Sequence, residues 1–141
     1  MGGVACAAVL WWFVALSVCD IRERRLPNWL TLPGALVILS AAAMADRGLP
    51  AVAGAVALFA VYVTTHLLAP AAMGAGDVKL AIGVGALTGA FGIDVWTLAA
   101  MGAPLITAAW ALVVARHREA TVPHGVSMCL AAATATALVT L

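Results

Sequence analysis

The stretch VWTLAAMGAPLITAAWALVVA, residues 95–115, carries no charged side chain from its first residue to its last. A helix needs about 20 predominantly apolar residues to cross the hydrocarbon core of a bilayer, and this stretch is long enough. An isolated strand cannot satisfy its backbone hydrogen-bonding groups in lipid, whereas a helix satisfies them internally. The stretch therefore predicts a transmembrane helix.

Charged residues divide the whole chain into uncharged runs of this kind. There are six of them: residues 1–19, 26–45, 48–76, 80–93, 95–115 and 120–141. The fourth run is too short to span alone, so we expect its helix to begin near Gly76. The first run lacks the positively charged start of a signal peptide, so we expect it to be retained. The pattern predicts an all-α membrane protein, a bundle of about six transmembrane helices, with residues 1–141 forming a single polytopic domain.

The composition excludes several other classes of protein. Apolar residues make up 65% of the 141 residues and charged residues only 9%, whereas an ordinary soluble domain has about 25% charged residues. The formal net charge is +1, so no basic field attracts a phosphate backbone. These values exclude a soluble globular protein, a disordered segment and a nucleic-acid-binding protein.

The basic residues are distributed unequally between the two ends of the expected bundle. Six of the seven fall in the first, third and fifth loops, which share one side: Arg22, Arg24, Arg25, Lys79, Arg116 and Arg118. Arg47 alone falls on the other side. Because loops rich in Lys and Arg stay in the cytoplasm, we expect a multi-pass protein of the inner (plasma) membrane with both termini extracytoplasmic.

One acid falls where an apolar helix should begin. The segment MGAGDVK, residues 73–79, places Asp77 in the first turn of the fourth expected helix, directly behind two glycines. An ionisable residue at this depth is costly and suggests a functional site, although a helix-capping Asp at the water interface has the same spacing. A capping Asp needs neither Gly74 nor Gly76, whereas a site that admits a substrate backbone beside the carboxylate needs both.

A second carboxylate that shares a water with Asp77 must lie at the same membrane face. Asp20 ends the first expected helix at that face, whereas Asp46 and Asp94 fall on the opposite one. The remaining acids on the correct face lie among arginines in loops, where we expect solvated ion pairs: Glu23 and Glu119. Asp20 is therefore the expected partner of Asp77.

Three stretches resemble the motifs of the type IV prepilin peptidases, a family of GxGD-type intramembrane aspartic proteases. They are Asp20 followed by RRLPNWLTLPG at residues 24–34, GAGDVKL at residues 74–80, and PHG at residues 123–125. The resemblance implies an aspartic endopeptidase that removes the leader peptide from type IV pilin-like precursors at the cytoplasmic face. Its catalytic residues would be Asp20 and Asp77.

The same resemblance implies the remaining site residues and partners. Residues that bind substrate or shape the site would be Gly74, Gly76, Lys79, Pro123, His124 and Gly125. The long stem of Lys79 reaches either the interface, as an anchor, or an acidic group of the substrate. The expected partners are membrane-inserted pilin or pseudopilin precursors and the lipid bilayer. The chain has no CxxC motif, so it resembles the short, protease-only form.

We expect no cofactor and no metal, because no pair of histidines has metal-ligand spacing and the two acids lack nearby His or Cys ligands. Helix polarity suggests the roles of the acids. Asp77 lies near the positive N-terminal end of its helix, which favours the charged form and the role of base. Asp20 lies near the negative C-terminal end of its helix, which favours the role of acid, although Arg22 and Arg24 oppose this effect.

An alternative function is a small channel or transporter subunit in which Asp20, Asp77 and Lys79 line an ion path. A conducting path needs polar residues through the depth of the bilayer, whereas these three cluster at one face. A structural membrane scaffold, such as a catalytically dead homologue, is a further alternative. The presence of both acids argues against the scaffold.

Overall fold

The part of the chain that the structure describes folds into six α-helices. The structure, a computed structural model, describes residues 2–115 and 122–140. The helices are α1 (Gly3–Glu23), α2 (Asn28–Met44), α3 (Gly48–Leu68), α4 (Ala75–Phe91), α5 (Ile93–Val114) and α6 (His124–Thr140). No strand occurs among the described residues. The predicted all-α bundle of six helices is confirmed.

Helices α1, α3 and α5 are long and apolar enough to cross a membrane, judged by length and composition. Helices α2, α4 and α6 have 17 residues each, which is near the lower limit for a spanning helix. Helices α2 and α6 are also apolar and expose large hydrophobic side chains, among them Leu36 and Leu138. The molecule is therefore an all-α membrane bundle.

The third helix is shorter than the uncharged run that predicted it. Helix α3 ends at Leu68, and residues 69–74 form a loop before α4 begins at Ala75. Pro70 lacks a backbone N–H and disfavours a helical conformation at the preceding residue, which explains the end of α3. The fourth helix begins where the sequence predicted, with Asp77 in its first turn.

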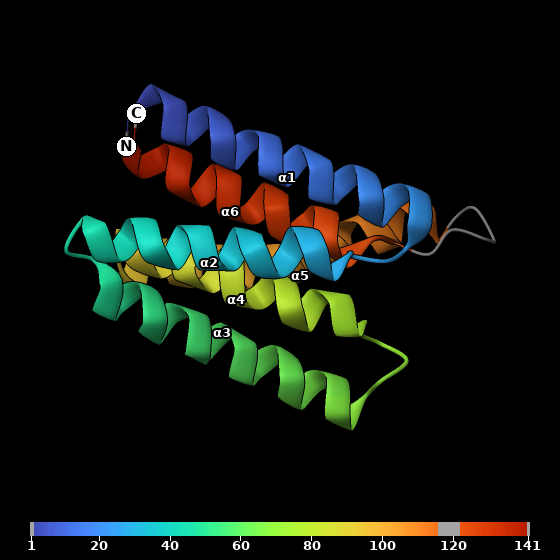
Figure 1. The fold of residues 1–141 in the computed structure, drawn as a ribbon. Helices are drawn as coiled ribbons and strands as arrows, with labels where there is room; N and C mark the ends of the chain where they lie inside the picture. Colours follow the sequence, from blue (N-terminus) through green and yellow to red (C-terminus); the bar gives the residue numbers. More distant parts are fainter. Residues whose placement is uncertain (1, 116–121, 141) are drawn as a thin grey trace.

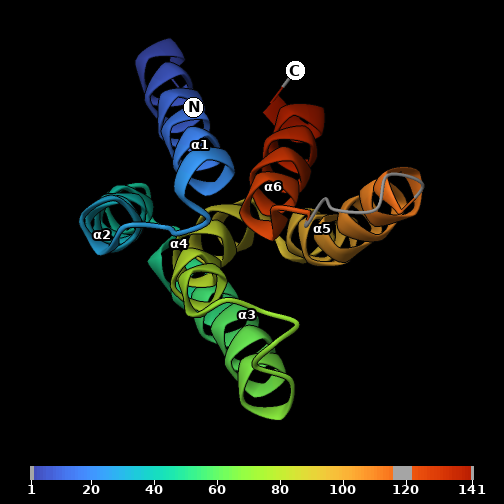
Figure 2. The same ribbon diagram turned by 90° about the vertical axis from the view of Figure 1, so that its right-hand side faces the viewer.

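Helix α4 lies at the centre of the bundle. Figure 2 shows α4 surrounded by the other helices, and it contacts α2, α3, α5 and α6. Eleven of its 17 residues are buried, against three of the 21 residues of α1. The acid at the start of α4 is therefore held by the best-packed element of the fold.

Glycines allow α3 and α4 to approach closely. A Cβ added at Gly89 would lie 2.6 Å from the carbonyl oxygen of Pro50, and one added at Gly54 would lie 2.8 Å from the Cα of Gly89. A Cβ at Gly54 would also collide with the carbonyl oxygen of Gly85. Small residues at a helix contact permit such tight packing in membranes, and this contact fixes the position of α4.

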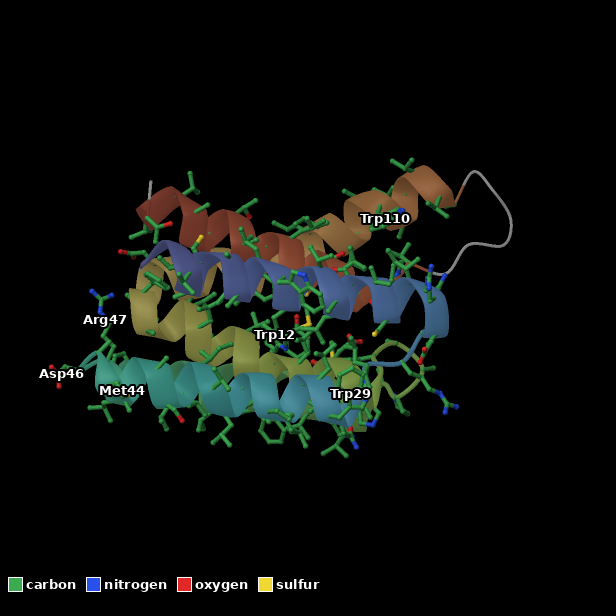
Figure 3. The ribbon with its side chains drawn as sticks, turned by 45° about the horizontal axis from the view of Figure 1, so that its top comes forward. Trp12, Trp29, Met44, Asp46, Arg47 and Trp110 are labelled. Atoms are coloured by element: carbon green, nitrogen blue, oxygen red, sulfur yellow. The ribbon has the colours of Figure 1, made fainter. Side chains whose placement is uncertain are left out.

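Trp12 connects the first helix to α2 and α4. The Trp12 indole Nε1–H donates a hydrogen bond to Leu30 O at 2.9 Å. Its ring lies against Gly34 of α2 and Gly83 of α4, where a Cβ would collide with it. Trp12 thus fills the space between α1, α2 and α4 near the middle of the bundle (Figure 3).

The bundle has two distinct ends. The start of α1 and the end of α6 lie at one end, together with the α2–α3 turn that carries Asp46 and Arg47 (Figures 1 and 3). We call this the terminal end. Helix α1 ends and α4 begins at the opposite end, which we call the basic end because Arg22, Arg24 and Lys79 occur there. Arg116, Arg118 and Glu119, which were predicted to lie at this face, are outside the described residues.

Candidate active site

Asp20 lies in the last turns of α1 and is 7% exposed. The backbone N–H of Val126, in the first turn of α6, donates a hydrogen bond to Asp20 Oδ2 at 3.2 Å. The carboxylate therefore faces the N-terminal end of a second helix, whose free N–H groups and dipole stabilise negative charge. The close packing of α1 beside α6 produces this arrangement (Figure 2).

Gly125 provides the space that the Asp20 carboxylate occupies. A Cβ at Gly125 would lie 2.8 Å from Asp20 Oδ2, and 3.3 Å from the Cδ1 of Leu26. Any side chain at this position would push against the carboxylate. The glycine predicted to shape the site thus lies in direct contact with one of the two predicted catalytic acids.

Asp77 occupies the first turn of α4 and is 9% exposed. Gly74 is the N-cap residue of α4, and its carbonyl oxygen accepts a hydrogen bond from the backbone N–H of Asp77 at 3.2 Å. A Cβ at Gly76 would lie 3.0 Å from the Cβ of Leu26. Gly76 therefore permits the α1–α2 loop to pack directly on the start of α4.

Asp20 and Asp77 line the same pocket, which has a volume of about 270 Å³. The other residues that line it are Arg24, Arg25, Leu26, Gly74, Ala75, Gly76 and Lys79. The structure thus brings the two predicted acids together at the basic end of the bundle. The pocket has room for several water molecules and is flanked by three basic residues.

Lys79 lines this pocket and also contacts the start of α2. Its Nζ donates a hydrogen bond to Asn28 Oδ1 at 2.7 Å. The contact joins a residue of the first motif to a residue of the second. Lys79 therefore connects α2 and α4 at the edge of the pocket.

Leu26 is a pocket residue that the sequence analysis missed. It is 7% exposed and packs against both Gly76 and Gly125. It therefore lies between the glycine beside Asp77 and the glycine beside Asp20. In the sequence Leu26 is the first residue of the second uncharged run, and nothing there distinguishes it from the apolar residues that follow.

Pro123 and His124 do not line the pocket. They directly precede Gly125 and Val126, which contact the Asp20 carboxylate. Pro123 is buried and directly precedes α6, and His124 is the first residue of that helix. His124 Nε2 lies 3.0 Å from Tyr62 Oη of α3, and its Nδ1 lies 2.7 Å from Thr107 Oγ1 of α5. Tyr62 and Thr107 were missed by the sequence analysis, because neither has a local motif.

The α3–α4 loop is closed by another histidine. His66 Nδ1–H donates a hydrogen bond to Met73 O at 2.7 Å, directly before Gly74. The side chain is only partly buried. His66 therefore holds the loop that leads into the second motif.

The acids predicted to lie on the opposite face do so. Asp46 lies in the α2–α3 turn at the terminal end (Figure 3), and Asp94 lies in the first turn of α5 at the same end. Among residues 2–115 and 122–140, no group of three or more His, Cys, Asp or Glu side chains is placed to hold a metal ion.

Comparison with known families supplies the remaining evidence. A model described as the type IV leader peptidase family matches residues 7–141, which is nearly the whole chain. Comparisons with curated proteins and with solved structures give no match. The match agrees with the resemblance that the three motifs suggested. The chain belongs to the type IV leader peptidase family, and it is a membrane-embedded peptidase.

Proposed function

We propose that this peptidase is of the aspartic type and removes the leader peptide from type IV pilin or pseudopilin precursors. The observation that carries the proposal is the shared pocket of Asp20 and Asp77. The two acids come from separate motifs and separate helices, and the fold places both at one end of the bundle. Membership of the leader peptidase family supports the prepilin type of substrate.

Two carboxylates in one pocket suit peptide hydrolysis, because two neighbouring acids do not readily carry charge at the same time. The ionised acid takes a proton from a water molecule, whose oxygen attacks the scissile carbonyl carbon. The protonated acid donates its proton to the carbonyl oxygen, which gives a neutral tetrahedral intermediate. The C–N bond then breaks as the leaving amine takes a proton from the first acid, while a hydroxyl group of the intermediate returns its proton to the second, which restores the pair.

The contacts of Asp20 favour it as the ionised member of the pair. Its Oδ2 accepts the Val126 N–H at the start of α6, and such a bond stabilises the charged form. The expectation from helix polarity weighed the negative end of α1 against Arg22 and Arg24, and it assigned Asp20 as the acid. With the positive end of α6 against its carboxylate, Asp20 becomes the base and Asp77 the acid.

The position of the pocket supports cleavage at the membrane surface. The pocket lies at the basic end of the bundle and is lined by Arg24, Arg25 and Lys79. Because loops with basic residues stay in the cytoplasm, this end faces the cytoplasm and both termini face outward. A membrane-inserted precursor would present its leader at that side. This chemistry uses no cofactor and no metal.

A cleavage assay with purified protein tests the proposal. The protein in detergent is incubated with a precursor that carries a prepilin-type leader, and mass spectrometry identifies the new N-terminus. We expect a single cut at the end of the leader, unchanged by EDTA. Activity that is lost in EDTA and restored by a divalent ion would overturn the aspartic mechanism. A precursor that stays intact would overturn the proposed substrate class.

A further inference from the structure

A second pocket lies at the terminal end of the bundle, between α1, α2 and α4. Its volume is about 510 Å³, and it shares no lining residue with the pocket of the two acids. Trp12 fills the space between these three helices at mid-depth. Towards the terminal end the facing side chains are small, among them Ala8 and Ala41. The three helices therefore enclose an apolar crevice there.

Among the described residues, Arg47 is the only charged one that lines this crevice. Its Nη1–H donates a hydrogen bond to Ala90 O at 3.1 Å, and its guanidinium carbon lies 5.9 Å from the centre of the Phe91 ring. These contacts hold the guanidinium at the last turn of α4, where it is exposed. A guanidinium has five N–H donors in a fixed fork that matches a phosphate group.

We propose that this crevice binds a single membrane phospholipid, with one acyl chain between α1 and α2 and the phosphate on Arg47. The apolar lining suits an acyl chain, and the cation at one end suits the phosphate. Asp46 and Asp94 lie at the same end, so the field there does not favour a net negative headgroup. The site therefore recognises the phosphate rather than the net charge of the lipid.

The test uses full-length protein from which lipid has been removed in detergent. Phosphatidylglycerol, phosphatidylethanolamine or diacylglycerol with the same chains is added back, and native mass spectrometry measures the bound lipid. Arg47→Gln removes the cation, and Ala41→Leu fills the crevice from an exposed position. Arg22→Gln is the matched control, because it removes an exposed arginine at the basic end that lines neither pocket.

We expect one retained phospholipid of either headgroup, and about tenfold weaker retention in Arg47→Gln, as for loss of a charge-assisted hydrogen bond. Ala41→Leu should weaken retention similarly, and Arg22→Gln should match the unmodified protein. Equal retention of diacylglycerol, or unchanged retention in both Arg47→Gln and Ala41→Leu, would overturn the proposal. A co-purified polypeptide in place of lipid would also overturn it.

A second inference concerns the residues that hold the start of α6. Thr107 Oγ1 donates a hydrogen bond to Ala103 O at 3.0 Å, so its oxygen is the acceptor for His124 Nδ1–H. The Nε2 atom of His124 then accepts the hydroxyl hydrogen of Tyr62. With His124 as a neutral imidazole, each donor in this chain has one acceptor. Helices α3 and α5 thereby hold the first residue of α6.

We infer that Tyr62 and Thr107 are positioning residues for cleavage, an inference that rests on the proposed function. His124 is two residues before Val126, whose N–H holds the Asp20 carboxylate. Moving His124 would move this N–H group and change the orientation of Asp20. The two hydroxyl groups therefore act on the reaction through α6 and do not touch the substrate.

Tyr62→Phe and Thr107→Val remove the hydroxyl groups and keep the approximate shape of each side chain. Both should lower kcat about tenfold and leave KM for the precursor unchanged, because the substrate contacts remain. Thr65→Val is the control, since the Thr65 hydroxyl donates its hydrogen bond to Val61 O within α3. Unchanged kcat in both variants, while the unmodified protein cleaves, would overturn this inference alone. If kcat falls only together with the thermal unfolding midpoint, the role of the two hydroxyl groups is structural, and this result would also overturn the inference.

Discussion

Gly125→Ala should separate the geometry of the site from the stability of the fold. The added Cβ would lie 2.8 Å from Asp20 Oδ2, whereas ordinary van der Waals contact begins at 3.4 Å. The carboxylate must therefore move by about 0.6 Å, the difference between these two distances. The hydrogen bond from Val126, already 3.2 Å long, would then exceed the usual range.

A misplacement of about 1 Å can cost an enzyme roughly 10²-fold in rate. We therefore expect Gly125→Ala to lower kcat/KM by roughly 10- to 100-fold. The effect on stability should be small, because the helix preference of Ala over Gly, about 0.5–1 kcal/mol, offsets part of an overpacking cost of about 1–3 kcal/mol. The free energy of unfolding should fall by less than about 2.5 kcal/mol.

The measurements are the initial rate of leader cleavage and the thermal unfolding midpoint in the same detergent. Gly3→Ala is the matched control, because a Cβ at Gly3 has no neighbour within 4 Å. It should keep both the rate and the midpoint of the unmodified protein. A folded Gly125→Ala protein that cleaves at the unmodified rate would refute the placement of Asp20 against α6.

Three other changes test separate parts of the structure. Gly54→Ala should lower the unfolding midpoint, because its Cβ would collide with the carbonyl oxygen of Gly85 across the α3–α4 contact; an unchanged midpoint would contradict this packing. Lys79→Met removes the bond to Asn28 Oδ1 and should lower cleavage modestly in a protein that still inserts, and a loss as complete as that of an Asp variant would assign Lys79 a larger role. Reporter fusions at residue 141 should show an extracytoplasmic C-terminus, and a cytoplasmic one would contradict the proposed orientation.

The helices could be predicted from the sequence because lipid allows few alternatives to a helix. An uncharged run of sufficient length is then enough to locate each helix. The end of α3 could not be predicted this way, since residues 69–74 carry no charged side chain, like the helix before them. Pro70 was the available signal, and it acts through the backbone rather than through hydropathy.

The pairing of Asp20 with Asp77 was predicted because consecutive membrane helices run in opposite directions. The end of the first helix and the start of the fourth therefore share one face. Leu26, Tyr62 and Thr107 were not predicted. Each is an ordinary apolar or hydroxyl residue whose significance depends on contacts between distant helices. The expected roles of the acids failed to include α6 for the same reason: the sequence does not show that α1 packs beside α6.

Substitution of the acids tests the central claim most directly. Asp20→Asn and Asp77→Asn are compared in the cleavage assay with Asp46→Asn and Asp94→Asn, which make the same change at the terminal end. The account predicts that the first two abolish cleavage while the protein remains folded in the membrane. It predicts near-normal cleavage for the other two. Full activity in either Asp20→Asn or Asp77→Asn would contradict a catalytic pair of carboxylates.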